Sequence, residues 1–181
     1  MDLNWKLNKT EHIVQDEWID FRKESFILPD GKEFSPFYNY SRRNFVVIIA
    51  KTKDGKYITV RQFRHGLKKV TTEFCAGGIE GSEHESALLA AKRELEEETG
   101  YISDNWKHIY TIPSNPTIAD NYAFLYYADN CEKVSNQHLD STEFLEVKEY
   151  TEDEINDLIK NNEFVQPIHL MGWLMVKKGV L

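Results

Sequence analysis

The first half of the chain consists of short runs in which apolar and polar residues alternate or β-branched residues cluster. Residues 17–28 alternate in this way and end at a Pro-Asp-Gly turn. Residues 44–51 are apolar almost throughout, and an Asp-Gly pair connects them to a further run at 57–63. An Asp-Gly pair between two such runs is typical of a β-hairpin. The pattern predicts strands at all three places, with 44–51 in the centre of a sheet.

The second half mixes helical and strand patterns. A glycine-rich turn precedes a run from Glu85 onwards that fits an uninterrupted helix. Further strands are expected at 106–112, 121–128 and 144–150. Residues 151–154 have the form of a capping box, which predicts a helix through about 159, and a last helix is expected at 166–178. The sum predicts an α/β fold in which helices flank a mixed β-sheet.

Composition fits one small enzyme-sized domain with an extension. The chain has 181 residues, 41% of them hydrophobic, and we divide it into an antiparallel β extension at 1–43 and a main domain at 44–181. A formal net charge of −8 without a basic stripe argues against nucleic-acid binding. No apolar N-terminal segment or membrane-length run stands out, and two cysteines form no disulfide framework. We therefore expect a cytoplasmic protein with no membrane partner.

Acidic residues near the end of the long predicted helix are the main candidates for chemistry. Glu94, Glu97 and Glu98 stand at positions i, i+3 and i+4, so they share one helix face. Like charges at this spacing repel one another, and an acidic run is often only a solvated face. A hard divalent cation would turn the repulsion into attraction, because Mg²⁺ prefers carboxylate and phosphate oxygens. The spacing therefore favours a metal site.

The surrounding sequence resembles the Nudix box, the signature of the Nudix hydrolase family. The match is Arg93-Glu94-Leu95-x-Glu97-Glu98-x-Gly100-Tyr101, with Glu85 eight positions before Arg93. One departure is that seven residues separate Gly77 from Glu85 where the family pattern has five. The extra residues fall in the turn, around Gly81-Ser82, and leave the helix in register. The resemblance implies the Nudix α/β/α sandwich with a mixed sheet.

The resemblance also implies roles for single residues. Glu94, Glu97 and Glu98 would hold Mg²⁺ or Mn²⁺, and Ala76 would offer a backbone carbonyl to the ion. Arg93 would orient a glutamate, and Glu85 would be structural. Cys75 replaces the proline that usually precedes the position of Ala76. The expected reaction is attack of a metal-activated water on a phosphorus atom of a nucleoside diphosphate linked to a group X.

The general base is a separate assignment. In the branch of the family that cleaves ADP-ribose, it often comes from an acidic segment before a late strand, here 140–147. Glu143 is our first candidate and Asp140 the second. In other branches Glu94 itself is the base.

The substrate class follows from further resemblances to the ADP-ribose and nucleoside-diphosphate-sugar pyrophosphatases. The segment 60–66 is similar to theirs, with Arg64 as the expected phosphate-binding residue and Arg61 as a second candidate; an edge-strand arginine in water is the alternative. Pro116 lies fifteen residues after Tyr101, near the spacing of that branch. There the N-terminal extension usually pairs with a second subunit, so a homodimer is expected.

Two other functions remain open. One is a house-cleaning hydrolase of nucleoside triphosphates, against which the N-terminal extension argues mildly. The other is a non-catalytic Nudix module that senses a nucleotide. Such modules typically lose the box glutamates, and this chain keeps Glu94, Glu97 and Glu98.

Overall fold

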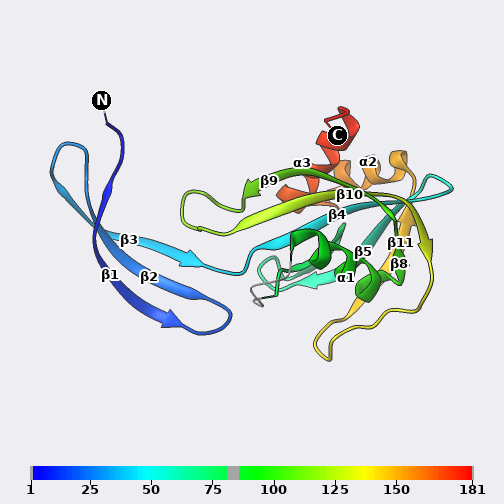
Figure 1. Cartoon of the computed structure of the whole chain (residues 1–181), viewed down its shortest axis with the longest axis horizontal. Helices are drawn as coiled ribbons and strands as arrows, with labels where there is room; N and C mark the ends of the chain where they lie inside the picture. Colours follow the sequence, from blue (N-terminus) through cyan, green and yellow to red (C-terminus); the bar gives the residue numbers. More distant parts are fainter. Residues whose placement is uncertain (1, 81–85, 181) are drawn as a thin grey trace. The chain divides into compact units, whose positions relative to one another are not determined.

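The computed structural model describes residues 2–80 and 86–180 (Figure 1). The chain forms two compact units, Met1–Arg43 with Pro113–Tyr122, and Asn44–Ile112 with Ala123–Leu181. Glu85 and the inserted turn at Gly81-Ser82 lie outside the described residues. The prediction of an extension at 1–43 used for dimerisation is untested by this division and stays a prediction.

The smaller unit is built on a three-stranded antiparallel sheet in the order β1-β2-β3. Its strands are β1 (Lys6–Gln15), β2 (Asp20–Ile27) and β3 (Glu33–Ser41). β2 confirms the strand expected at 17–28, whereas β1 is largely polar and exposed and gave no clear alternation. Four aromatic rings cluster on this sheet in edge-to-face contacts: Trp5, Phe26, Phe34 and Phe37. Phe21 of β2 and Tyr38 of β3 form a further, stacked pair with ring centroids 5.7 Å apart.

The larger unit holds an eight-stranded mixed sheet with the central order β11-β5-β4-β10-β8. β6 pairs with β5, β7 with β4 and β9 with β10, and β4 runs parallel to β10. The strands are β4 (Phe45–Thr52), β5 (Tyr57–Arg64), β6 (Lys69–Glu73), β7 (Cys75–Gly78), β8 (Tyr101–Ile102), β9 (Asn105–Pro113), β10 (Tyr122–Lys133) and β11 (Leu145–Tyr150). The run at 44–51 is central, as predicted, because residues 46–50 have no exposed surface.

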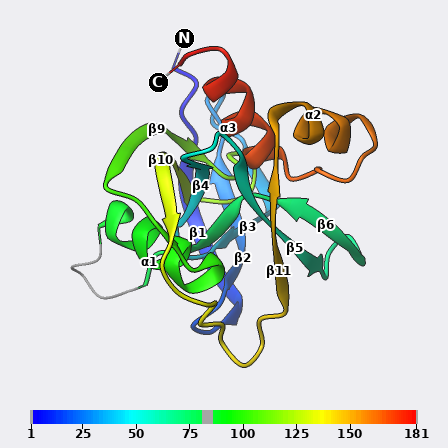
Figure 2. The same ribbon diagram turned by 90° about the vertical axis from the view of Figure 1, so that its right-hand side faces the viewer.

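Helices cover both faces of this sheet (Figure 2). α1 (Ala87–Thr99) packs Ala91 and Leu95 against the face that carries Ile48. α2 (Glu152–Lys160) and α3 (Pro167–Lys177) pack against the opposite face, which carries Ile49. The predicted α/β/α sandwich is therefore confirmed. Among the described helices, none is both long and apolar enough to cross a membrane.

The caps of α1 fix where the acidic helix begins and ends. Ser86 is the N-cap, and its hydroxyl accepts a hydrogen bond from the backbone N–H of Leu89 at 3.3 Å. Gly100 ends the helix with φ 74°, and its N–H donates to the carbonyl of Glu96 at 2.7 Å. The helix thus begins at Ala87, two residues later than the expected start at Glu85.

Candidate active site

The glutamates of α1 lie over β7, and a glycine makes room for them. Gly77 pairs with Val46 of β4 and faces the helix. A Cβ atom at this position would lie 1.9 Å from Cδ of Glu94 and about as close to both carboxylate oxygens. Only glycine therefore allows the Glu94 carboxylate to rest on the strand.

Arg93 connects two of the glutamates to the strand. Its Nη1 donates to Oε1 of Glu94 at 2.9 Å and to Oε2 of Glu97 at 3.0 Å. Its Nη2 donates to the backbone carbonyl of Gly78 at 3.1 Å. The guanidinium thus holds both carboxylates against β7, which is the orienting geometry expected for this residue.

Glu98 is more enclosed than Glu94. Its side chain is buried, and Oε2 accepts a hydrogen bond from the backbone N–H of Ala76 at 3.3 Å. Burial raises the pKa of Glu98 to about 8, against the lowering effect of hydrogen bonds from the Cys75 thiol and the Ala76 amide. Burial likewise raises the pKa of Glu94 to about 7, opposed by the charge of Arg93. Two enclosed carboxylates are therefore poorly compensated by positive charge.

Such a donor set fits a divalent cation. In the part of the chain that the structure describes, no three acidic, histidine or cysteine side chains converge as a ready-made ligand set. Arg93 forms ion pairs with Glu94 and Glu97, and Glu98 accepts a hydrogen bond from the backbone N–H of Ala76. Nevertheless, the carboxylates are hard oxygen donors, and the open cradle at Gly77 brings Glu94 against the strand. Glu94, Glu97 and Glu98 are thus the described side chains whose chemistry suits a hard cation.

Glu143 lies in the loop that precedes β11. It is exposed, and its carboxylate accepts a hydrogen bond from the backbone N–H of Asp140 at 3.0 Å. Its negative charge contributes to the raised pKa of Glu94 and Glu98. The structure therefore brings Glu143 within electrostatic range of both glutamates, while Asp140 forms the turn that holds it.

The two candidate arginines of β5 point to opposite faces of the sheet. Ile58 belongs to the core under α1, so Arg64 shares its face by alternation, whereas Arg61 does not. Arg64 forms a two-pronged ion pair with buried Glu73, with Nε at 3.1 Å from Oε2. Arg61 pairs with exposed Glu146 at 3.3 Å, across the ladder between β5 and β11. Only Arg64 thus lies on the same face as the glutamates.

Comparison with known proteins identifies the family of this chain. A model of the NUDIX domain matches residues 40–169, which is most of the sequence. The chain belongs to the Nudix family. It is 33% identical over 174 residues to the ADP-ribose pyrophosphatase of Bacillus subtilis (strain 168), covering 94% of this chain and 92% of that protein. The predicted Nudix pyrophosphohydrolase is therefore confirmed as the class of enzyme.

One further relative and one solved structure are similar to this chain over most of its length. The methanol dehydrogenase activator of Bacillus methanolicus is 33% identical over 156 residues, covering 86% of this chain and 83% of that protein. The crystal structure of an ADP compounds hydrolase aligns with a TM-score of 0.83 over 99% of this chain and 96% of that chain. Its sequence identity of 18% shows the shared fold alone.

Sequence reasoning missed Glu73 and did not explain Gly77. Glu73 was not considered because β6 was not predicted as a strand. Thr71 pairs with Gln62, and Glu73 lies two residues further along the same strand. Strand alternation could therefore have placed the Glu73 side chain on the sheet face that α1 covers in this Nudix fold. The box pattern contains a glycine at position 77, but it does not explain why glycine is needed there. The reason is the Glu94 carboxylate, which occupies the space that a Cβ atom would take.

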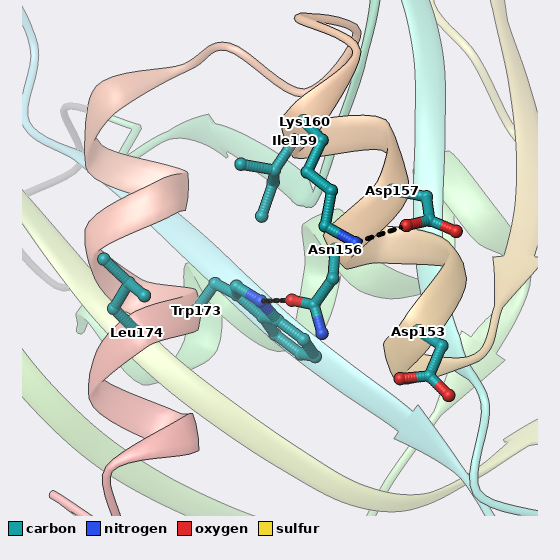
Figure 3. Close-up of a pocket in the computed structure, with 7 residues that line it drawn as sticks. All are labelled: Asp153, Asn156, Asp157, Ile159, Lys160, Trp173 and Leu174. Atoms are coloured by element: carbon teal, nitrogen blue, oxygen red, sulfur yellow. Dashed lines mark hydrogen bonds and ion pairs between the residues drawn. The ribbon is translucent and has the colours of Figure 1, made fainter.

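A surface hollow of about 520 Å³ lies between α2 and α3 (Figure 3). Trp173 donates its indole N–H to Asn156 at 3.2 Å, and Lys160 pairs with Asp157 at 2.7 Å. Its lining includes none of the predicted site residues. The hollow lies on the side of the sheet opposite α1, so it is separate from the Nudix glutamates.

Proposed function

We propose that this Nudix hydrolase cleaves the pyrophosphate bond of a nucleoside diphosphate linked to a second group, with ADP-ribose or a nucleotide sugar as substrate. The observation that carries the proposal is the position of Arg64 on the same sheet face as Glu94 and Glu98. A phosphate-binding group and cation-binding groups would then act from one face of the sheet. Similarity to an ADP-ribose pyrophosphatase along nearly the whole of both chains supports the choice of substrate.

The proposed roles follow the site geometry. Glu94, Glu97 and Glu98, with the backbone of Ala76, would hold Mg²⁺ or Mn²⁺. When bound, such an ion neutralises the diphosphate and acidifies a water molecule. Arg93 keeps the carboxylates in place. These residues would orient the substrate so that water attacks one phosphorus, the P–O–P bond breaks, and ADP-ribose yields AMP and ribose 5-phosphate.

Glu143 is the proposed general base. It is exposed, so it can exchange protons with solvent, and it stands within electrostatic range of the glutamates. Glu94 is the alternative, because burial raises its pKa to about 7, close to neutral pH. Removal of a proton from the attacking water by either group would generate the nucleophile.

We further propose a homodimer in a reducing, cytoplasmic setting. The aromatic cluster around Trp5 leaves Trp5 and Phe34 almost half exposed, which suits contact with a second copy. Both cysteines, Cys75 and Cys131, are free and buried, which is compatible with a reducing compartment.

The proposal is tested by a panel of nucleotides incubated with Mg²⁺ or Mn²⁺, with release of phosphate esters as the readout. The panel contains ADP-ribose, ADP- and GDP-sugars, NADH, coenzyme A, dinucleoside polyphosphates and nucleoside triphosphates. We expect turnover of ADP-ribose or a sugar nucleotide that chelator abolishes. Preference for triphosphates would discard the substrate assignment, and tight binding without any turnover would favour a nucleotide sensor.

A further inference from the structure

Polar side chains gather around Glu73 on the sheet face that α1 covers. Glu73 has no exposed surface. Its Oε1 accepts hydrogen bonds from Gln62 at 2.7 Å and from Nη2 of Arg64. Its Oε2 accepts from Nε of Arg64 at 3.1 Å and from the Thr71 hydroxyl at 3.4 Å. Four donors therefore saturate the carboxylate, and two of them fix the plane of the Arg64 guanidinium.

Fold stability alone gives little reason for this arrangement. Enclosing a carboxylate and a guanidinium carries a desolvation cost, and apolar side chains of similar volume often serve equally well. Arg64 also remains 34% exposed. Among residues 2–80 and 86–180, Glu73 is the acceptor that the Arg64 guanidinium binds, through Nε and Nη2, which leaves its other N–H groups open to a further acceptor.

The Arg64–Glu73 pair lies on the sheet face that carries the proposed metal-binding glutamates. Glu73 shares a sheet face with Val60, to which it is paired, and Cys75 and Gly77 face α1 as well. The backbone N–H of Ala76 donates a hydrogen bond to Glu98, and Gly77 leaves room for the carboxylate of Glu94. Because alternate strand residues share a face, Glu73 and the Arg64 that it binds lie on the same face of the sheet as Glu94 and Glu98.

We propose that Glu73 is a positioning residue that fixes Arg64 so that its open edge meets the diphosphate of the substrate. This inference rests on the proposed function. Because the pair is neutral, Arg64 then contributes directed hydrogen bonds rather than net charge. Removal of the Glu73 charge would make the site more positive yet weaken substrate binding, whereas a purely electrostatic effect would strengthen it.

The test combines turnover with binding in the absence of metal. Wild-type turnover of ADP-ribose is established first, and α,β-methylene ADP-ribose is then titrated calorimetrically into the metal-free protein. We expect Glu73→Gln and Arg64→Ala each to raise Kd and KM about tenfold, with kcat nearly unchanged. The double variant should bind no more weakly than Arg64→Ala, since Glu73 acts through Arg64. Arg64→Lys should not restore binding, because it lacks the fork.

Glu146→Gln is the matched control, because it breaks the other Arg–Glu pair of β5, on the opposite face. It should leave Kd unchanged. If Glu73→Gln fails to fold, Glu73→Asp keeps the charge and withdraws the carboxylate by one methylene, with the same expected rise in Kd. Unchanged or tighter binding in a folded Glu73 variant, or additive effects in the double variant, would overturn the inference. A wild type that neither binds nor hydrolyses ADP-ribose would overturn the proposed function itself.

Discussion

At the scale of single residues, the backbone at Gly77 lies directly against the carboxylate of Glu94, a proposed metal ligand. Gly77→Ala would place a Cβ atom 1.9 Å from Cδ of Glu94, so the carboxylate must move away from the strand. We expect the Mg²⁺ concentration needed for half-maximal turnover to rise about tenfold or more. Gly66→Ala is the control, because no heavy atom of the described residues beyond its chain neighbours lies within 4 Å of its Cβ position. Equal metal titrations for both variants would contradict the proposed support.

The glutamates of α1 allow an internal comparison on one helix. Glu98 is buried over β7, whereas Glu96 is exposed on the same helix. Glu98→Gln should lower kcat about 100-fold or more, because a metal-bound charge is lost, while the fold survives. Glu96→Gln should leave steady-state kinetics unchanged. Near-normal turnover in Glu98→Gln would remove Glu98 from the proposed metal site.

His169 predicts a pH dependence of stability that is separate from catalysis. It is buried, and its Nδ1 accepts a hydrogen bond from the backbone N–H of Phe74 at 3.2 Å. Burial, with a smaller effect of the Arg64 charge, lowers the pKa of His169 to about 3. Between pH 6.5 and 3 the unfolded chain thus binds a proton that the native state does not.

The contribution of His169 to stability should therefore be complete above pH 6.5. Below that pH, the free energy of unfolding should fall by about 1.4 kcal/mol per pH unit from this residue. Urea unfolding at pH 7 and pH 5 measures the change. His169→Asn keeps an acceptor near the Phe74 amide and does not titrate, so its stability should vary less with pH. An equal slope in both proteins would refute the assignment.

At the scale of elements, the end of α1 depends on the left-handed conformation of Gly100. A Cβ atom there would lie 2.2 Å from the carbonyl oxygen of Ser135, and φ is 74°. Gly100→Ala should destabilise the protein by about 2 kcal/mol or more. Gly179→Ala follows α3 with φ 68° but has open space, so it should cost about 1 kcal/mol. Thermal or urea unfolding of both variants separates backbone strain from the clash.

Elements with a strong local sequence pattern were predicted, whereas short strands that depend on pairing were not. Residues 44–51 and the capping box at Thr151 gave a strand and a helix as expected, since both signals are local. β6 and β7 were missed because Lys69–Glu73 and Cys75–Gly78 are short and polar or glycine-rich. Their strand conformation comes from pairing with β5 and β4, which no local pattern reports.

At the scale of the whole molecule, the main prediction is a homodimer through the aromatic cluster of the small sheet. Light scattering should give about twice the chain mass of 21.2 kDa. The double substitution Trp5→Ser and Phe34→Ser should shift the protein toward a monomer, because it removes apolar area that the dimer would bury. Phe144→Ser is the control, as that ring is 83% exposed in the larger unit. A monomeric wild type would contradict the prediction.

The amino-acid pattern was enough to predict the family, the sandwich and the acidic helix face. Glu94, Glu97 and Glu98 could be assigned to one face because helical spacing is a local property of the chain. Tertiary structure alone decided that Glu94 rests on Gly77 and that Arg64 is held by Glu73. These contacts join strands and helices whose register depends on packing, so burial, and with it the raised pKa of Glu98, emerges only when the sheet is assembled.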